Sequence, residues 1–297
     1  MSPRDEAVRD ALDALLAGTD ARVRTANDPI ELVHRFEDDG DREVVGLVAS
    51  SLAFGNAKAI RAKVGDVVAR LGPSPANRIG SVGPTRLVND LHGLVHRVYR
   101  GEDIARLLSA AAEVRRARGS LGDALRVHFE QAGTIREALA RLRDDLLDAA
   151  PPARMRRGFR HLLPDPRAGS PCKRLNLWLR WMVRGPDGVD LGIWRLPKSA
   201  LVVPLDVHVF RISRNLGLTR RKTPRWETAE EITARLRRFD PDDPVKYDFA
   251  ICHLGVARDC PSRREPVKCG RCVLKGVCLR WASSREAQAR SSGAQPP

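Results

Sequence analysis

The stretch from Ala200 to Phe210, ALVVPLDVHVF, decides the fold class. Its apolar run is the part of the sequence that looks most like a β-strand. Pro204 interrupts the run, and a proline removes a backbone donor that a central strand needs. Asp206 then stands where a helix cap is expected, because aspartate accepts hydrogen bonds from the first backbone amides of a helix. The stretch therefore predicts an extended connector that leads into a helix.

Helical signals run through most of the remaining chain. Capping residues precede apolar positions at helical spacing, and Gly or Pro follows where a helix should end. At Ser120 with Asp123, and at Thr134 with Glu137, the spacing is that of a capping box. Helices are expected over DREVVGLVASSLAFG (41–55), NAKAIRAKVGDVVARLG (56–72), SLGDALRVHFEQAG (120–133), TIREALARLRDDLLDAA (134–150), KRLNLWLRWMV (173–183), ETAEEITARLRRF (227–239) and PVKYDFAICHLG (244–255). The sequence predicts an all-α fold.

The composition agrees with a helical protein of the cell interior. Aromatic residues make up 5% of the 297 residues, which suits helices packed through Leu, Val and Ala. The first ten residues are charged where a signal peptide needs an apolar run, and no apolar stretch approaches the roughly 20 residues of a membrane span. We therefore expect a cytoplasmic protein with no membrane partner. Its small, polar last residues, 283–297, are expected to be disordered.

Basic residues are concentrated in the second half of the chain, within a net charge of +15. Residues 154–184 contain nine Lys or Arg and one acid, and residues 206–226 contain six and one, with tryptophans interleaved. A general preference for arginine explains a high charge, but its concentration is typical of a protein that binds a polyanion. Double-stranded DNA is the expected partner, with association with the nucleoid. The expected contacts are Lys173, Arg174, Arg180, Arg184, Arg211, Arg264, Lys268, Arg271 and Lys275.

Four of the six cysteines lie within CPSRREPVKCGRCVLKGVC, at Cys260, Cys269, Cys272 and Cys278. The spacing C-x8-C-x2-C-x5-C places them in one compact loop. Structural zinc sites more often use two short pairs joined by a longer finger, whereas a [4Fe–4S] cluster takes four thiolates from such a loop. A [4Fe–4S] cluster is the expected cofactor, with zinc as the alternative. Its expected role is to stiffen a basic segment that has few apolar residues.

Three motifs in this order resemble endonuclease III, a member of the helix-hairpin-helix–GPD superfamily of DNA glycosylases. They are VPLDVHVFRISRNLGL (203–218), FAICHLGVARDC (249–260) and CGRCVLKGVC (269–278). Over most of the chain, from HRFEDDGDREVVGLVASSLAFG onward, the sequence resembles an uncharacterised bacterial branch of that superfamily. The family has six residues between its first two cluster cysteines, where this chain has eight.

The resemblance implies two helical lobes. One lobe is a helical barrel, expected at residues 41–203, with extra sequence near 90–170. The other combines residues 1–40 with 204–282 and carries the cysteine segment. The protein is expected to be a monomer.

The resemblance also implies a role for Asp206 in base-excision repair. Asp206 matches the position of the family's catalytic aspartate, and Pro204 stands two residues before it. Bifunctional members use a lysine some eighteen residues upstream, and Gly188 stands there in this chain. A monofunctional DNA N-glycosylase that uses Asp206 is therefore expected, with Lys173 as a remote candidate for a nucleophile. The alternative is a non-catalytic [4Fe–4S] protein that recognises DNA structure or redox state; a zinc-stabilised RNA-binding protein is a third possibility.

Overall fold

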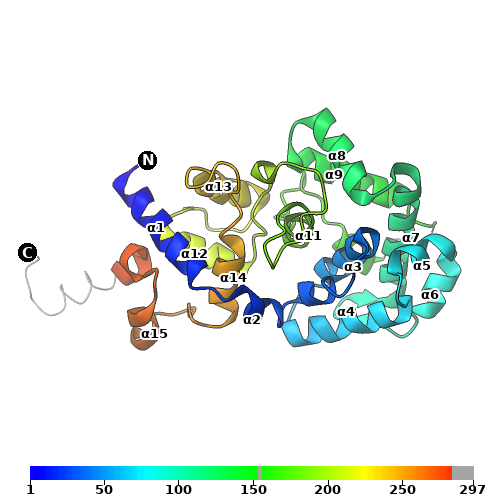
Figure 1. The fold of residues 1–297 in the computed structure, drawn as a ribbon, viewed down its shortest axis with the longest axis horizontal. Helices are drawn as coiled ribbons and strands as arrows, with labels where there is room; N and C mark the ends of the chain where they lie inside the picture. The colour runs from blue at the N-terminus through cyan, green and yellow to red at the C-terminus, as the bar shows by residue number, and fades with distance from the viewer. Residues whose placement is uncertain (153–155, 283–297) are drawn as a thin grey trace, which may run out of the picture. The chain divides into compact units, whose positions relative to one another are not determined.

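The structure is a computed structural model that describes residues 1–152 and 156–282. Helices dominate it (Figure 1). Within these residues the strands are β1 (Val95–His96) and β2 (Tyr99–Arg100), which pair antiparallel. The chain divides into two compact units. The first unit comprises residues 1–20 and the chain from residue 202 onward, and the second comprises residues 21–201. The structure places the two boundaries after residues 20 and 201. The sequence predicted them after residues 40 and 203, which is twenty and two residues too late.

The second unit holds most of the helices. They are α2 (Ala21–Thr25), η1 (Pro29–Leu32), α3 (Asp39–Ser51), α4 (Ala57–Leu71), α5 (Pro75–Ser81), α6 (Pro84–Asp90), α7 (Gly101–Arg118), α8 (Leu121–Ala132), α9 (Ile135–Asp148), α10 (Arg157–Leu162), α11 (Lys173–Val183) and η2 (Lys198–Ala200). Its core forms where α3 packs against α11, with Trp178 and Trp181 fully buried. Gly46 allows this approach, because a Cβ there would lie 2.7 Å from the Met182 side chain.

Several helix starts follow the sequence signals, and others differ. The helix expected over 244–255 begins at Asp248, four residues later than expected. The Ser120 and Thr134 side chains accept hydrogen bonds from the backbone amides three residues ahead and cap α8 and α9 as predicted. Helix α3 is capped by Asp38, three residues before the helix start expected at Asp41. Asp41 is buried within the first turn, and its Oδ1 accepts from the Ala76 amide at 2.7 Å. It joins α3 to α5.

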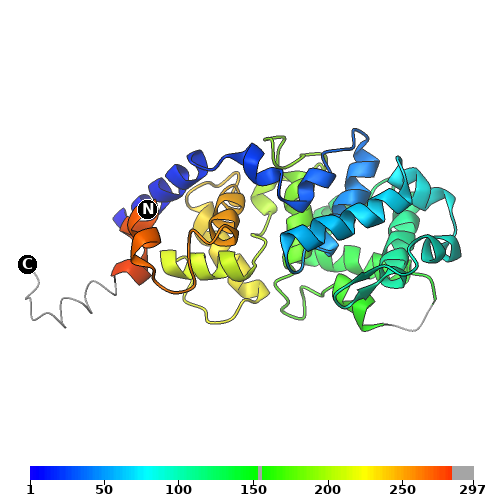
Figure 2. The ribbon, with the colours of Figure 1, turned by 90° about the horizontal axis from the view of Figure 1, so that it is seen from below.

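The first unit is built from fewer helices (Figure 2). They are α1 (Pro3–Ala17), α12 (Val207–Leu216), α13 (Trp226–Arg237), α14 (Asp248–Val256), α15 (Pro266–Arg271) and η3 (Lys275–Val277). Helix α12 packs on α14, and the fully buried Tyr247 donates from its hydroxyl to Asp13 on α1 at 2.7 Å.

The connector that decides the fold class is extended and forms no strand. Residues 201–205 are buried, and the Val203 amide donates to the Thr233 hydroxyl at 3.0 Å. A side chain of α13 thus satisfies a backbone donor that a sheet neighbour would otherwise satisfy. No helix in the described part of the chain is long and apolar enough to cross a membrane. The tail expected to be disordered, 283–297, lies outside the described residues, as does Arg154.

Candidate functional site

Asp206 stands at the start of α12 with both carboxylate oxygens engaged. Oδ1 accepts from the backbone amides of His208 and Val209, each at 2.8 Å, so the predicted cap is confirmed. Oδ2 lies 3.6 Å from the thiol sulfur of Cys252 on α14. The side chain remains half-buried rather than enclosed. The carboxylate is therefore held in one orientation and keeps access to solvent.

The surroundings of Asp206 are formed by close packing of α12 on α14. Gly255 makes this possible, because a Cβ there would lie 2.5 Å from the Cβ of His208. His253 is buried, with its ring centroid 4.3 Å from that of Phe249. Both histidines thus pack within the first unit.

The glycine-rich loop after α11 satisfies its own polar groups. The Oδ1 of Asp187 accepts from the amides of Val189 at 3.0 Å and Asp190 at 2.8 Å. Asp190 is buried, and its two oxygens pair with Arg180 at 3.2 Å and Arg184 at 2.8 Å. These amides are already used, and two carboxylates stand beside them. The loop is thus built for internal packing and offers no cradle for a phosphate.

Three of the residues expected to contact DNA lie inside the second unit. Arg174 is 8% exposed and donates to the carbonyl of Ser51, to the Tyr99 hydroxyl and to the carbonyl of His161. Arg180 and Arg184 hold the loop described above. Their guanidinium groups are used within the protein, which argues against direct contact with a polyanion. We do not propose these three as DNA contacts. Lys173, the remote candidate for a nucleophile, donates to the carbonyl of Ala53 at 3.3 Å.

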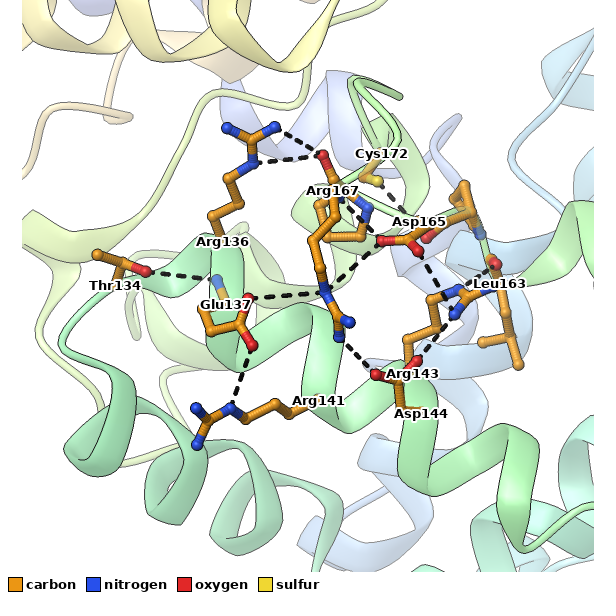
Figure 3. A network of polar contacts seen from close by, with 12 residues as sticks. Thr134, Arg136, Glu137, Arg141, Arg143, Asp144, Leu163, Asp165, Arg167 and Cys172 are labelled. Carbon is orange, nitrogen blue, oxygen red and sulfur yellow. Dashed lines mark hydrogen bonds and ion pairs between the residues drawn. The ribbon is translucent and has the colours of Figure 1, made fainter.

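Acidic side chains of α9 neutralise part of the same basic stretch (Figure 3). Arg167 pairs with Asp144 at 2.5 Å and with Glu137 at 3.6 Å, and Arg143 of α9 donates to the Leu163 carbonyl at 3.0 Å. Arg156 similarly pairs with two acids of α7, Glu102 and Asp103. Arg156 and Arg167, two of the nine basic residues counted between 154 and 184, therefore fasten this segment onto α7 and α9.

The thiol of Cys172 belongs to the same internal network. Its Sγ lies 3.6 Å from the carbonyl oxygen of Pro164, and the residue is 1% exposed. Burial raises the pKa of Cys172 to about 12. A thiol in this state is not a nucleophile at neutral pH.

The four clustered cysteines gather in the first unit on short turns. Cys260 donates its backbone amide to Leu254 at the end of α14, and the Cys278 amide donates to Lys275 in η3. Burial raises the pKa of Cys260, Arg211 opposes the rise, and the neighbouring thiols of Cys272, Cys278 and Cys269 add to it. The four cysteines thus belong to one segment whose thiols influence one another electrostatically.

Binding a metal requires the ligand atoms to lie within bonding distance of one centre, which is more than belonging to one segment. Among residues 1–152 and 156–282, no three His, Cys, Asp or Glu side chains meet closely enough to hold a metal ion as they stand. The donor chemistry nevertheless fits a thiolate-bound cluster. Four half-buried free thiols share one segment, and the guanidinium of Arg211 favours the thiolate form at Cys260.

Basic side chains surround the four cysteines. The guanidinium of Arg264 lies 4.3 Å from the Trp281 ring centroid, and the Lys275 ammonium lies 5.1 Å from it, so one aromatic ring orients two cations. Lys268 pairs with Glu265 at 3.5 Å, and Arg271 is exposed. These four residues, with Arg211, are the expected DNA contacts that stay available on the first unit.

Glu43 is a buried residue that the sequence gives no reason to single out. Its Oε1 accepts from the Gly122 amide at 3.0 Å and from the Trp194 indole at 2.9 Å, and its Oε2 pairs with Arg115. These partners lie 72 to 151 residues away in the chain. Through these three partners, Glu43 joins α3 to α7, α8 and the segment after α11. The contact of Cys252 with Asp206 is equally invisible to spacing, since 46 residues separate them.

Comparison with known proteins gives a family and no activity. No curated protein matches the chain. The model of one family, described as a protein of unknown function (DUF2400), matches residues 28–257. The match includes Asp206 and Cys252 and ends three residues before Cys260. Because it covers well over half of the sequence, the chain belongs to the DUF2400 family of proteins of unknown function.

Proposed function

We propose that the protein binds double-stranded DNA and hydrolyses an N-glycosidic bond with Asp206, as a monofunctional DNA N-glycosylase in base-excision repair. One observation carries the proposal. The Asp206 carboxylate is fixed by two backbone amides and faces a thiol, and it belongs to the same unit as the basic, four-cysteine segment. A carboxylate held in this way needs no reorganisation when charge develops near it.

The chemistry that suits such a carboxylate is cleavage of a bond whose transition state is positively charged. As the C1′–N bond of a nucleotide breaks, its electron pair leaves with the base and the sugar becomes oxocarbenium-like. The Asp206 carboxylate stabilises this charge and orients a water molecule, whose oxygen bonds to C1′. The water proton passes to Asp206 and then to solvent or the departing base. The target base has to leave the stack before this reaction.

The available lysines support water rather than an amine as the nucleophile. Between residues 174 and 205 the sequence contains one lysine, Lys198. Lys173 is held by its contact with the Ala53 carbonyl in the second unit. A Schiff base with the sugar requires a free, deprotonated amine at the reacting carbon. We therefore propose base release without strand cleavage.

The proposed cofactor is a [4Fe–4S] cluster bound by Cys260, Cys269, Cys272 and Cys278, with zinc as the alternative. When bound, the metal group would cross-link the segment from Cys260 to Cys278. That cross-link would fix Arg264, Lys268, Arg271 and Lys275 relative to one another. Fixed cations bind a phosphate backbone with less loss of side-chain entropy than mobile ones.

A second candidate, a non-catalytic DNA-binding protein, is favoured by the loop after α11. In that loop the backbone amides of Val189 and Asp190 donate to the carboxylate of Asp187. The loop therefore has no free amides there for a phosphate, so DNA recognition would have to rest on other residues. Both candidates predict binding to duplex DNA that weakens as salt rises. They differ in turnover.

The deciding experiment is a base-release assay on duplexes that carry a panel of damaged or mismatched bases. We expect the wild-type protein to release at least one base and Asp206→Asn to release none at a matched concentration. Asp38→Asn is the control, because Asp38 caps α3 in the way that Asp206 caps α12. Equal release by Asp206→Asn would refute the role of this carboxylate. Tight duplex binding without release from any substrate would establish the non-catalytic candidate.

A further inference from the structure

A groove of about 990 Å³ lies within the first unit, away from the residues discussed above as catalytic. It is bordered by the start of α1, the second half of α12 with the turn after it, one side of α13, and the chain just after Cys278. Figure 2 shows the blue start of α1 next to the red end of the described chain. Six arginines and two acids line it: Arg4, Arg211, Arg214, Arg220, Arg235, Arg280, Asp5 and Glu231.

The acids of the groove are already paired with particular arginines. Asp5 binds Arg238 at 2.9 Å and Arg235 at 3.4 Å, and Glu231 binds Arg221 at 2.6 Å. Within residues 1–152 and 156–282, four groove arginines have no carboxylate partner: Arg4, Arg211, Arg214 and Arg220. Unpaired guanidinium groups that share a groove repel one another and attract anions. The groove therefore carries more arginine charge than its carboxylates neutralise.

Two of these arginines are held in place by neutral groups. Arg4 donates from Nη2 to the Leu216 carbonyl at 3.3 Å and to the Val277 carbonyl at 3.2 Å. The guanidinium of Arg214 lies over the Phe210 ring, 5.8 Å from its centroid. Both contacts orient the guanidinium group without neutralising its charge. An oriented, planar fork of donors is the group that recognises phosphate oxygens in pairs.

The size and lining of the groove narrow the class of ligand. Pockets for small organic ligands measure about 300–1,000 Å³, so this groove is larger than one phosphate ion requires. Val8, Leu216, Leu218 and Leu279 add apolar surface to its walls. Several unpaired arginines match an anion of several charges. We propose that the groove binds a small organic molecule that carries two or more phosphate groups, such as a nucleoside triphosphate.

This site is distinct from Asp206. Helix α12 has ten residues, which corresponds to a length of about 15 Å. Asp206 caps its first turn, whereas the groove is lined by residues from Phe210 to the turn at Thr219 and Arg220. A ligand in the groove can therefore bind whether or not the protein is a glycosylase.

The test is calorimetric titration of the full-length protein with ATP and, separately, with inorganic pyrophosphate, both without added metal. We expect ATP to bind, and the double variant Arg214→Ala/Arg220→Ala to weaken binding by about tenfold or more, because two charge-assisted contacts are lost. Lys198→Ala/Lys222→Ala is the matched control, since it removes two exposed charges outside the groove. It should bind ATP within about twofold of wild type. Circular dichroism checks that each variant is folded, and Arg214→Lys/Arg220→Lys should recover part of the affinity.

The two titrants separate the parts of the proposal. Tighter binding of ATP than of pyrophosphate supports recognition of an organic phosphate. Equal affinity would mean that phosphate alone is recognised and would overturn the organic part. The proposal fails if neither compound binds to wild type or if the arginine variant binds ATP normally. A variant that loses only affinity for duplex DNA would assign the groove to nucleic acid instead.

Discussion

The thiol sulfur of Cys252 lies 3.6 Å from Oδ2 of Asp206, where α14 packs against α12. The other oxygen of the same carboxylate starts α12 by accepting from two backbone amides. Asp206 thus combines a structural task with an exposed charge whose orientation is fixed. These two tasks can be separated, because asparagine caps a helix about as well as aspartate and carries no charge.

Asp206→Ala is expected to lower the free energy of unfolding by about 1 kcal/mol, whereas Asp206→Asn should leave it nearly unchanged. Both variants should lose base release, because neither has a carboxylate at this position. Urea unfolding followed by circular dichroism measures the first effect, and the base-release assay measures the second. If Asp206→Asn destabilised the protein as much as Asp206→Ala, the capping role drawn from the two amide contacts would be wrong.

Cys252→Ala should lower the free energy of unfolding by about 1 kcal/mol, because it removes the thiol that contacts the Asp206 carboxylate where α12 packs on α14. Cys252→Ser keeps a donor at this position and is expected to unfold more nearly like wild type. Urea unfolding at neutral pH, followed by circular dichroism, measures the effect on each variant. Equal stability of all three proteins would contradict the prediction.

Local signals in the sequence were sufficient for many of the helices and for the Asp206 cap, but α1, α5, α6 and α7 were not among the helices expected. A cap and the amides that it satisfies lie within three residues, so Asp206, Ser120 and Thr134 are readable from spacing. Pro204 likewise predicts an extended connector rather than a strand of a sheet. The contacts that the sequence could not give join distant segments, as in the bond from Arg4 to the Leu216 carbonyl, 212 residues away. The first unit itself depends on such contacts, because α1 belongs with helices that follow residue 202.

Charge counted along the sequence misplaced the basic residues that stay available. The count between 154 and 184 treats each arginine as free, yet Arg167 pairs with acids that lie 23 and 30 residues earlier in α9. Arg174 and Arg180 point inward because their helix is buried on several sides. Periodicity marks the apolar positions of that helix but does not reveal a buried acceptor such as the Ser51 carbonyl. The count over 206–226 does include Arg211, Arg214 and Arg220 of the basic groove, but it gives no sign that Arg4 from α1 joins them.

Arg180→Ala should destabilise the second unit by about 3–5 kcal/mol, because it leaves the buried Asp190 with only Arg184 as its cationic partner. Its affinity for duplex DNA, measured on the folded fraction, should stay within about twofold of wild type. Arg271→Ala should behave in the opposite way, with unchanged unfolding and DNA binding that is weaker and less dependent on salt. Urea titration and fluorescence anisotropy at two salt concentrations measure both effects. Loss of DNA affinity in a folded Arg180→Ala protein would contradict this prediction and indicate that Arg180 contacts DNA.

Protein purified without oxygen is expected to contain about four iron atoms per chain, and Cys269→Ser should lower the iron content sharply. Removing the metal should expose the segment between Cys260 and Cys278 to protease, because short turns with few buried residues would then lack a cross-link. Cys172→Ser is the control, since this buried thiol belongs to the other unit and should leave the iron content unchanged. Metal analysis and limited trypsin digestion provide the two measurements. One zinc atom per chain, with no iron, would select the alternative metal.

His96 should make the second unit less stable as the solution becomes acidic. The residue is 6% exposed, its Nε2 lies 3.1 Å from the Leu52 carbonyl oxygen, and burial, with the nearby charges of Arg97 and Lys63, lowers its pKa from 6.5. Below pH 6.5 the histidine of the unfolded chain binds a proton more readily than His96 of the folded protein does. The free energy of unfolding therefore decreases as the pH is lowered, by at most about 1.4 kcal/mol per pH unit. His96→Gln should flatten this dependence between pH 7.5 and 5. His92→Gln, at an exposed histidine four residues earlier, should retain it. Parallel curves for His96→Gln and wild type would show that His96 is protonated as easily in the folded protein as in the unfolded chain.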